Sequence, residues 1–395
     1  MGRGAPVRHV VVAGGGVAAI AVTRTLRSEG FDGEITLIDP DRHSPYDRTR
    51  LSKDFLLGAA EIDDIRLLRD REIESFDVTI TRRAAVSLDV ACTQIGLDDG
   101  RQIGYDGLVI ATGSRARALP LGSTSPSGVH VLRSLSDALA LRTALAGARR
   151  LVVIGGGFVG LEVAATAAEL GVQVAVVEID PAPLARVLGT RVGAAIGSRL
   201  TARGVELVTG AHARAWIGDD RLTGVALADG RQLAADVALV GVGAAPNVDW
   251  LAGSPLGGED GVVCDVTLAT EIPGIVAAGD VARWPHPAGG VVRIEHFEHA
   301  EMSGSHAARS LLSEGEGAPY GPLPFVWSHQ GGHSIYFAGF PAPNGTLDIV
   351  EGDIEDGPFA ATYRTGDRPT AVVTLDLPRT FHRLRRELQS QGATV

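Results

Sequence analysis

Cysteine is scarce in this sequence, and its scarcity narrows the chemistry. The 395 residues include only two cysteines, Cys92 and Cys264, which stand far apart and form no CxxC pair. Neither a metal cage nor an adjacent redox disulfide is therefore encoded locally. We expect both cysteines to be ordinary residues of a core or a strand, and we expect no metal site.

Long apolar runs and an excess of positive charge are also missing. The sequence has no uninterrupted apolar run of about 18 residues, the length of a membrane span. The first residues, MGRGAPVRHVVVAGGG, show no cleavable signal pattern. These absences predict a cytoplasmic protein with no membrane partner. The net charge of −11 argues against nucleic-acid binding, which needs a basic surface, but leaves room for local basic patches.

The composition of the chain is instead that of a folded, globular protein. It is 45% hydrophobic and 21% charged. A chain of this length and composition typically forms two or three domains with sizeable cores.

An internal repeat organises the sequence. Residues 10–39, VVVAGGGVAAIAVTRTLRSEGFDGEITLID, and residues 151–180, LVVIGGGFVGLEVAATAAELGVQVAVVEID, each predict a strand, a glycine turn, a helix and a second strand. Glycine allows a tight turn and the close approach of a pyrophosphate, which the helix N-terminus attracts. Asp39 and Glu178 end the second strands, where a carboxylate can bind ribose hydroxyls. The motif residues are Gly14, Gly16 and Ala19 in the first copy, and Gly155, Gly157 and Gly160 in the second.

Two complete copies predict two bound dinucleotides, whereas a single glycine motif could be only a structural turn. Three further segments end strands in glycine turns: LVIATGSRAR at 108–117, DVALVGVGAAPN at 236–247 and TEIPGIVAAGD at 270–280. In this order the chain resembles the two-dinucleotide-binding flavoprotein reductases. The resemblance implies that Asp280 binds the ribityl chain of a flavin. It adds as cofactor-binding candidates Ala111, Thr112, Gly113, Gly243 and Gly279.

The segment PYDRTRLSK at residues 45–53 narrows the resemblance. It is similar to the PYxRPPLSK segment of the NADH-dependent ferredoxin reductases of oxygenase systems, which belong to the FAD-dependent pyridine nucleotide-disulfide oxidoreductase superfamily. Residues 131–138, 152–165, 293–300 and 324–330 resemble segments of the same family. Thiol enzymes of the superfamily carry cysteine after the first dinucleotide unit, and this chain has none before Cys92. Thiol chemistry at the flavin is therefore not expected.

The resemblance implies an α/β fold with two Rossmann-like domains, one nested in the other, and a C-terminal α+β domain. We expect residues 1–116 and 246–320 to form the FAD-binding domain, residues 117–245 the NAD(H)-binding domain, and residues 321–395 the C-terminal domain. Short strand-like runs between residues 325 and 375, followed by the basic helical segment RTFHRLRREL, fit the third assignment.

The resemblance also assigns the reacting groups. It places Lys53 beside the flavin N5, paired with Glu162 from the second dinucleotide helix. A positive charge there favours electron density moving onto the flavin. Glu162 lies in the apolar run FVGLEVAA, where a lone carboxylate would be costly. The further cofactor-binding candidates are Ala18 at the glycine turn, Ala85 at the adenine, Arg48 and Arg133 at the FAD phosphate or adenosine, and Glu295, Phe297 and Trp327. For the two aromatic residues, Phe297 and Trp327, packing in the core is the alternative.

Glu178 favours NADH, because a carboxylate there repels the 2′-phosphate of NADPH. The resemblance implies an NADH-dependent ferredoxin reductase that passes electrons from NADH through FAD, singly, to a [2Fe-2S] ferredoxin and indirectly to an oxygenase. An acidic ferredoxin would need a basic patch, for which the candidates are Arg82, Arg83, Arg379, Arg383, Arg385 and Arg386. The alternative is that these arginines only form a solvated charged face. The chain is expected to be a monomer or a homodimer.

Two other readings stay open at this point. One is a rubredoxin or other small-acceptor reductase, and the other is an NADH-sensing flavoprotein similar to apoptosis-inducing factor. The sequence departs from the family pattern at Thr49 and Arg50, where two prolines are usual, at Phe297, and at His329, where an aspartate is usual. These departures bear on the flavin surroundings and on partner docking.

Overall fold

The structure is a computed structural model that describes residues 7–43, 45–122, 125–288, 290–342 and 345–392. Its internal contacts divide the chain into two compact units. Unit 1 comprises Met1–Asp47, Arg66–Arg115 and Ala245–Pro324, and unit 2 comprises Arg48–Ile65, Ala116–Ala244 and Phe325–Val395. The assignment of FAD- and NAD(H)-binding domains to these stretches stays a prediction.

Unit 1 is built on a parallel five-stranded sheet. The first repeat supplies its centre, and β1 pairs with β2 on one side and with β7 on the other. Val10, Val11 and Val12 of β1 are fully buried, as expected for a parallel strand covered on both faces. In spatial order the strands are β19 (Ile275–Ala277), β7 (Gly107–Ile110), β1 (His9–Ala13), β2 (Glu34–Ile38) and β3 (Val78–Thr81).

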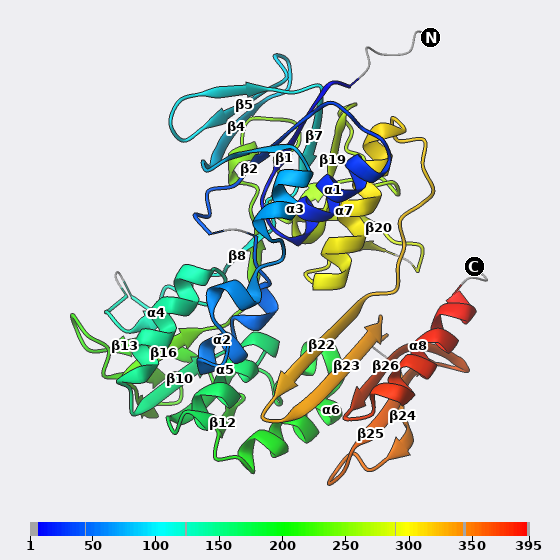
Figure 1. The fold of residues 1–395 in the computed structure, drawn as a ribbon. Helices are drawn as coiled ribbons and strands as arrows, with labels where there is room; N and C mark the ends of the chain where they lie inside the picture. Colours follow the sequence, from blue (N-terminus) through cyan, green and yellow to red (C-terminus); the bar gives the residue numbers. More distant parts are fainter. Residues whose placement is uncertain (1–6, 44, 123–124, 289, 343–344, 393–395) are drawn as a thin grey trace. The chain divides into compact units, whose positions relative to one another are not determined.

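Helices α1 (Val17–Ser28) and α7 (Phe297–Leu312) pack against each other in unit 1, although they lie far apart in the sequence (Figure 1). Gly304 of α7 permits this approach, because a Cβ at this position would run into the carbonyl of Ala18. The remaining elements of the unit are α3 (Asp70–Ser75), the sheet of β4 (Ala85–Asp89), β5 (Gln94–Leu97) and β6 (Gln102–Gly104), the sheet of β18 (Val262–Val263), β20 (Ala282–Pro285) and β21 (Val291–Val292), and the 3-10 turns η3 (Asp249–Leu251) and η4 (Gly279–Val281).

Unit 2 repeats the parallel arrangement with the second copy of the motif. Its sheet has the order β12 (Glu206–Thr209), β11 (Gln173–Glu178), β10 (Arg150–Ile154), β16 (Val237–Val240) and β9 (Val129–His130). The accompanying elements are α4 (Leu135–Ala146), α5 (Phe158–Glu169), α6 (Ala185–Thr201) and the antiparallel sheet of β13 (Ala213–Ile217), β14 (Gly224–Leu227) and β15 (Gln232–Ala234).

The C-terminal part of unit 2 is an antiparallel sheet followed by a helix. The strand order is β22 (Phe325–Gln330), β23 (His333–Gly339), β26 (Arg368–Leu375), β25 (Phe359–Thr365) and β24 (Thr346–Gly352), and α8 (Pro378–Gly392) follows. The short segment with η1 (Arg48–Arg50), α2 (Asp54–Leu57) and η2 (Ile62–Ile65) also belongs to unit 2. Leu56 of α2, Leu161 of α5 and Phe337 of β23 share one buried core, which explains why this segment joins unit 2.

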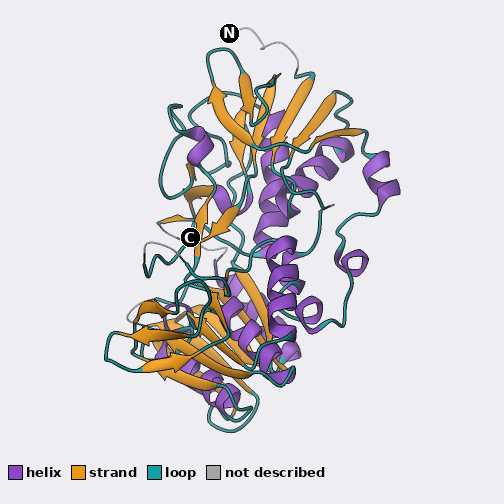
Figure 2. Ribbon diagram, turned by 90° about the vertical axis from the view of Figure 1, so that its left-hand side faces the viewer, coloured by secondary structure: helices purple, strands orange, loops and turns teal. Residues whose placement is uncertain are grey.

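Both units combine sheets with helices, so the predicted mixed α/β class is confirmed (Figure 2). The ribbon of β8 (Ser114–Ala116) and β17 (Ala244–Pro246) contains residues of both units. Among the residues that the structure describes, no helix has the length and apolar character of a membrane span. Nor, within the same residues, do three potential metal-ligating side chains come together.

The prediction for the cysteines is correct for one and wrong for the other. Cys264 is buried, 5% exposed. Cys92 is exposed and lies in the turn between β4 and β5, neither in the core nor in a strand. The carboxylate of Asp89 stabilises this turn by accepting the backbone N–H of Cys92 at 3.0 Å.

Candidate functional site

The first glycine turn gathers three segments of unit 1. Gly14 has φ +135°, and a Cβ there would run into the carbonyl of Ala111 in the second strand-end turn. A Cβ at Gly15 would overlap the carboxylate of Asp39. The turn between β1 and α1, Asp39 and the Ala111 turn therefore meet in space, as their predicted common role requires.

The second glycine of each motif faces open space. A Cβ added at Gly16 or at Gly157 would have no heavy atom within 4 Å. Each position is thus a cradle that a side chain would fill and that glycine leaves free beside a helix N-terminus. This geometry fits the pyrophosphate of a dinucleotide, which needs close approach to backbone N–H groups.

Asp39 is held in place by its neighbours. It is 9% exposed, and its carboxylate accepts the backbone N–H of Asp41 and lies 3.3 Å from the Nη1 of Arg82. Arg82 also donates to the carbonyl of Asp41. Arg82, considered above for a partner surface, is therefore engaged at the ribose end of the first motif. Arg83 is likewise ion-paired, at 2.9 Å from Asp99.

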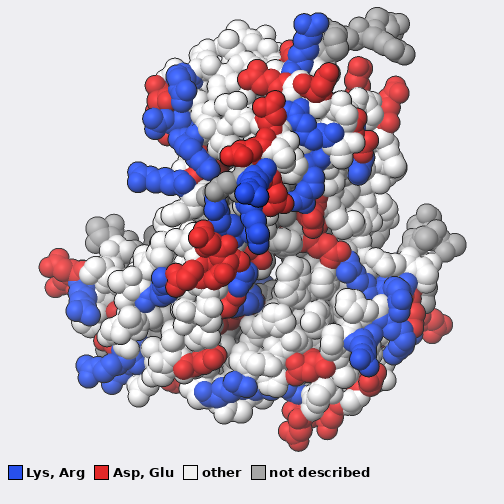
Figure 3. Space-filling model, viewed as in Figure 1, with Lys and Arg blue, Asp and Glu red and all other residues white. Residues whose placement is uncertain are grey.

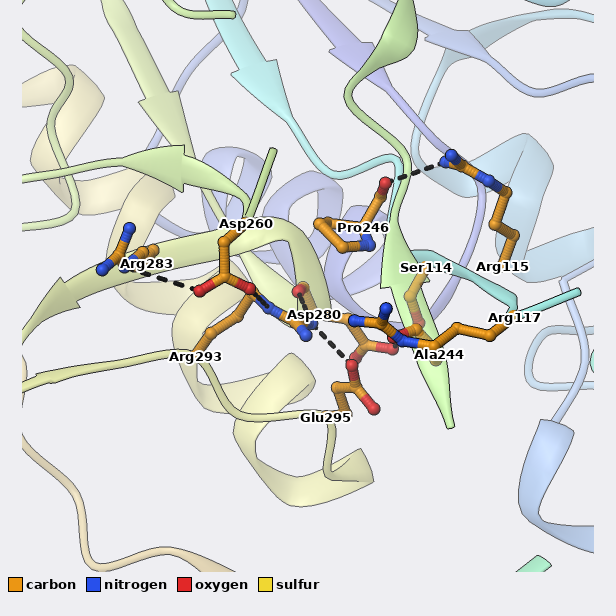
Figure 4. Close-up of polar contacts among 10 residues, drawn as sticks. All are labelled: Ser114, Arg115, Arg117, Ala244, Pro246, Asp260, Asp280, Arg283, Arg293 and Glu295. Carbon is orange, nitrogen blue, oxygen red and sulfur yellow. Dashed lines mark hydrogen bonds and ion pairs between the residues drawn. The ribbon is translucent and has the colours of Figure 1, made fainter. Parts of the chain in front are cut away.

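Asp280 lies in the η4 turn that follows β19, directly after Gly279 at φ +72°. It is 8% exposed, and its carboxylate accepts the hydroxyl of Ser114 at 2.7 Å (Figure 4). The guanidinium of Arg293 donates to the backbone carbonyl of Asp280 and pairs with Glu295 at 2.6 Å. The strand-end turn at residues 111–114 and the Gly279–Asp280 turn are thereby tied together.

The same turn is fixed from a further side. Thr112 and Asn247 exchange hydrogen bonds, because the Thr112 hydroxyl donates to the Asn247 carbonyl and the Asn247 amide donates to the Thr112 carbonyl. Ala18, at the start of α1, packs near Gly279. The remaining candidates of unit 1 lie at element starts: Ala85 opens β4 and Phe297 opens α7.

Two candidate arginines come together in unit 2. The guanidinium of Arg48 donates to the backbone carbonyl of Arg133 at 3.0 Å, and both residues are half-buried. Both were predicted to contact the FAD phosphate or adenosine, and they come from segments that are far apart in the sequence.

A cavity of about 490 Å³ lies over the second glycine turn in unit 2. Gly155, Gly157, Glu178 and Gly243, all predicted cofactor-binding residues, line it. The carboxylate of Glu178, 8% exposed, accepts the backbone N–H groups of Gly156 and Asp180. These two bonds fix the carboxylate at the cavity wall, where it can meet the ribose of a dinucleotide.

Lys53 and Glu162 form an ion pair at 2.7 Å within unit 2. The Lys53 side chain is 19% exposed and that of Glu162 is 6% exposed. Removing one partner of such a buried pair typically costs about 3–5 kcal/mol, because the other charge is left without compensation. The contact implied by the resemblance is therefore present, and the part it plays in catalysis stays a prediction.

Sequence reasoning missed the groups that complete this pair. The hydroxyls of Ser52 and Ser328 both bond to the carboxylate of Glu162, and the Lys53 ammonium also donates to the Thr49 carbonyl at 2.7 Å. Both serines lie in segments that carry the resemblance, Ser52 in LSK at residues 51–53 and Ser328 in WSHQ at residues 327–330, so their positions were visible although their partner was not.

The C-terminal sheet contributes an aromatic cluster and a histidine. The rings of Trp327 and Phe325 stack with centroids 5.6 Å apart, and the guanidinium of Arg385 lies 4.5 Å from the Phe325 centroid. His329 bonds to the Ser334 hydroxyl at 3.0 Å. Burial and then the nearby Lys53 ammonium lower the pKa of His329, so this departure from the family pattern lies in the electrostatic surroundings of the ion pair.

Comparison with known proteins places the whole chain. Residues 8–304 match the family described as pyridine nucleotide-disulphide oxidoreductase, and residues 325–395 match a reductase C-terminal family. The ferredoxin reductase component of chlorobenzene dioxygenase from Cupriavidus sp. (strain PS12) is 38% identical over 98% of this chain and 93% of its own length. The biphenyl dioxygenase system ferredoxin–NAD(+) reductase component from Paraburkholderia xenovorans is 37% identical over 88% of this chain and 85% of its own.

Solved structures give the same picture. The covalent putidaredoxin reductase–putidaredoxin complex matches with a TM-score of 0.91 and 30% identity, covering 96% of this chain and 93% of the other. A ferredoxin reductase from Rhodopseudomonas palustris matches with a TM-score of 0.91 and 31% identity, covering 96% and 95%.

Proposed function

The chain belongs to the pyridine nucleotide-disulphide oxidoreductase family, and we propose that it is an FAD-containing NADH:ferredoxin reductase. In this proposal it passes electrons from NADH, singly, to a [2Fe-2S] ferredoxin that serves a monooxygenase or a dioxygenase. The observation that carries the proposal is the buried Lys53–Glu162 pair in a segment without cysteine. The cytoplasmic location and the monomeric or homodimeric state stay predictions.

The two cysteines argue against disulfide chemistry. Burial raises the pKa of Cys264 to about 12, so its thiol stays protonated at neutral pH, and a protonated thiol is a poor nucleophile. A hydrogen bond with Asp89 raises the pKa of Cys92, which lies in an exposed turn. Neither thiol is activated, so the electrons must leave by another route.

The residues of unit 1 fit FAD. The open cradle at Gly16 would take its pyrophosphate, Asp39 its adenosine ribose, and Asp280 its ribityl hydroxyls. When bound, FAD accepts a hydride from NADH and releases electrons one at a time. The residues that line the cavity of unit 2 would hold the nicotinamide dinucleotide, with its pyrophosphate at Gly157.

Glu178 supports NADH rather than NADPH. Its carboxylate can accept a free ribose 2′-hydroxyl and repels a 2′-phosphate. Arg186, which also lines the cavity, is paired with Asp180 at 2.7 Å and so is engaged with a carboxylate already. The site therefore offers a 2′-phosphate more repulsion than attraction.

Lys53 and Glu162 perform the electrostatic work in this proposal. The Lys53 ammonium supplies a positive charge that stabilises negative charge developing nearby, and Glu162 keeps this ammonium from being an isolated buried cation. Lys53 is the only lysine among the 36 lysine and arginine residues of the chain. An ammonium is a compact point charge, whereas a guanidinium is a flat fork, and the two are not interchangeable in a tight site.

Helix α8 supports an acidic protein partner. Arg379, Arg383 and Arg386 are exposed, and arginine side chains gather over α8 in Figure 3. Arg383 is ion-paired with Glu387 at 3.2 Å, and Arg385 packs on Phe325. A basic face on a chain of net charge −11 favours encounter with an acidic ferredoxin, and raised ionic strength should weaken that encounter.

Rapid mixing tests the proposal in two stages. NADH should reduce the bound flavin quickly, and candidate [2Fe-2S] ferredoxins should then raise the turnover of cytochrome c. Fast flavin reduction with no stimulation by any ferredoxin, or stimulation by rubredoxin alone, would reject the ferredoxin assignment and leave the cofactor assignment intact.

Lys53→Met tests the reacting group. The variant should retain FAD, because Lys53 lies outside the predicted phosphate and ribose contacts, but its flavin should be reduced by NADH at least about tenfold more slowly, as one lost charge contact is worth about 1.5–3 kcal/mol. Arg101→Met, which removes a 61% exposed cation at a hairpin, is the matched control. A wild-type rate in Lys53→Met would exclude the proposed role.

A further inference from the structure

Three side chains bond directly to the buried carboxylate of Glu162, and a fourth acts through one of them. Its Oε2 atom receives Lys53 and the Ser52 hydroxyl, and its Oε1 atom receives the Ser328 hydroxyl at 2.6 Å. Gln330 in turn contacts the Ser328 Oγ through its amide nitrogen at 3.0 Å. The donors come from two separate parts of unit 2, the LSK segment and strand β22, and the accepting carboxylate lies on α5.

The chemistry of these groups fixes the direction of each bond. An ionised carboxylate only accepts hydrogen bonds, so Ser328 must donate its proton to Glu162. The group of Gln330 that faces Ser328 must then be the donating amide nitrogen. Ser328 is fully buried and Gln330 is 2% exposed, so neither finds its partner in bulk water. The result is a relay from Gln330 through Ser328 to Glu162, in which each bond polarises the next.

The relay acts on the lysine through the carboxylate. The Lys53 ammonium has three N–H groups, and its hydrogen bonds go to Glu162 and the Thr49 carbonyl, each at 2.7 Å. The carboxylate of Glu162 is held through both of its oxygens, so it keeps the ammonium in one place.

We propose that Ser328, oriented by Gln330, is a positioning residue that keeps the carboxylate of Glu162 aligned against Lys53. The inference rests on the proposed role of Lys53 at the flavin. It assigns a function to the WSHQ segment of the C-terminal sheet, whose serine and glutamine reach the ion pair from outside the second dinucleotide motif.

The first test is the rate of flavin reduction by NADH. Ser328→Ala should reduce the rate about tenfold at neutral pH, since a hydrogen bond to a charged group is lost. Ser328→Thr keeps the hydroxyl and should restore the wild-type rate, which a loss caused only by altered packing would not do. Gln330→Met should slow the reaction as Ser328→Ala does, and it serves if Ser328→Ala does not fold.

The second test reads Lys53 without turnover. Lys53 and the N-terminus are the only primary amines of the chain, so an amine-acylating reagent followed by peptide mass spectrometry reports on Lys53 alone. Its acylation should be severalfold faster in Ser328→Ala than in the wild type, because a loosened carboxylate holds the Lys53 side chain less firmly and the reagent reaches it more readily. Thr374→Val is the matched control. Thr374 lies in the same sheet, fully buried, and its hydroxyl has no partner among the described residues, so both readouts should stay at the wild-type values.

The outcomes separate this inference from the proposed function. Slow reduction in Lys53→Met together with wild-type flavin reduction and wild-type acylation in Ser328→Ala and Gln330→Met would overturn the inference and leave the reductase in place. Slower flavin reduction and faster acylation in Ser328→Ala, in a protein that reduces no ferredoxin, would uphold the inference and reject the partner. An effect of Thr374→Val equal to that of Ser328→Ala would also overturn the inference, because general loosening of the sheet would then suffice.

Discussion

Gly160→Ala should weaken NADH binding much more than it weakens the fold. Gly160 lies in the first turn of α5, and an added Cβ would overlap the carbonyl oxygen of Gly155 and lie 3.2 Å from Val153 Cγ1. The start of the helix must then move by about 1 Å to restore a normal contact. Since Gly157 and Phe158 of the same helix start line the cavity, the N–H groups expected to hold the pyrophosphate move as well.

The loss of stability and the loss of NADH affinity differ in size. Overpacking of this kind costs about 1–3 kcal/mol, but alanine is favoured over glycine inside a helix by about 1 kcal/mol, so the net loss of stability should be about 0–2 kcal/mol. Displacement of the binding groups by about 1 Å should cost tenfold or more in affinity, roughly 1.4 kcal/mol or above. The first repeat already has alanine at the equivalent position, Ala19, so the substitution does not forbid the motif itself.

The assay is the NADH concentration dependence of flavin reduction, combined with thermal unfolding. Gly147→Ala is the matched control, because Gly147 ends α4 with open space around its Cβ position and a negative φ. Gly160→Ala should raise the apparent Kd for NADH at least tenfold while the control does not. An unchanged Kd in both variants would refute the view that close backbone approach at Gly160 positions the dinucleotide.

Three further predictions follow from individual side chains. Glu178→Ala should lower kcat/KM for NADH by about 10–100-fold and reduce the preference for NADH over NADPH, since a charged hydrogen-bond acceptor is lost; unaltered discrimination would count against the assignment. Burial lowers the pKa of His299 to about 3, so below pH 6.5 the unfolded chain binds a proton that the folded protein does not. The free energy of unfolding should therefore fall by about 2 kcal/mol from this group between pH 7.5 and 5. Urea unfolding of His299→Phe should show a smaller fall over the same range, and an equal fall would contradict the argument. A thiol reagent should titrate Cys92 alone in the folded protein and Cys264 only after unfolding, and two fast thiols would disprove the burial of Cys264.

The local pattern of the sequence predicted what depends on neighbours in the chain. The apolar runs became the central parallel strands β1 and β10, and the turn glycines took the positive φ that only glycine adopts easily, as at Gly14 and Gly155. The position of Glu162 predicted a buried partner, because a carboxylate in an apolar run needs one. In these cases the physical requirement is visible within about ten residues.

Contacts between distant segments could not be predicted from local pattern. Residues 48–65 follow the first motif in sequence, yet Leu56 packs with Leu161 and Phe337 of unit 2. The bond between Arg48 and the Arg133 carbonyl, and the approach of Ser328 to Glu162, likewise join segments whose encounter no local pattern specifies. Cys92 was misplaced because the turn-forming effect of Asp89 was weaker as a signal than the apolar character of cysteine.

The placement of residues 48–65 decides how this chain can be recombined. Lys53 precedes the second dinucleotide motif by about a hundred residues, yet its carboxylate partner and its packing both belong to unit 2. A chimera that exchanges only residues 116–244 with a relative would place the original Lys53 segment against the Glu162 and the α5 surface of another protein. An exchange that also includes residues 48–65 and 325–395 would take the ion pair, both serines and the core that they share from the same protein. Recombinants of the second kind should keep hydride transfer where those of the first kind lose it.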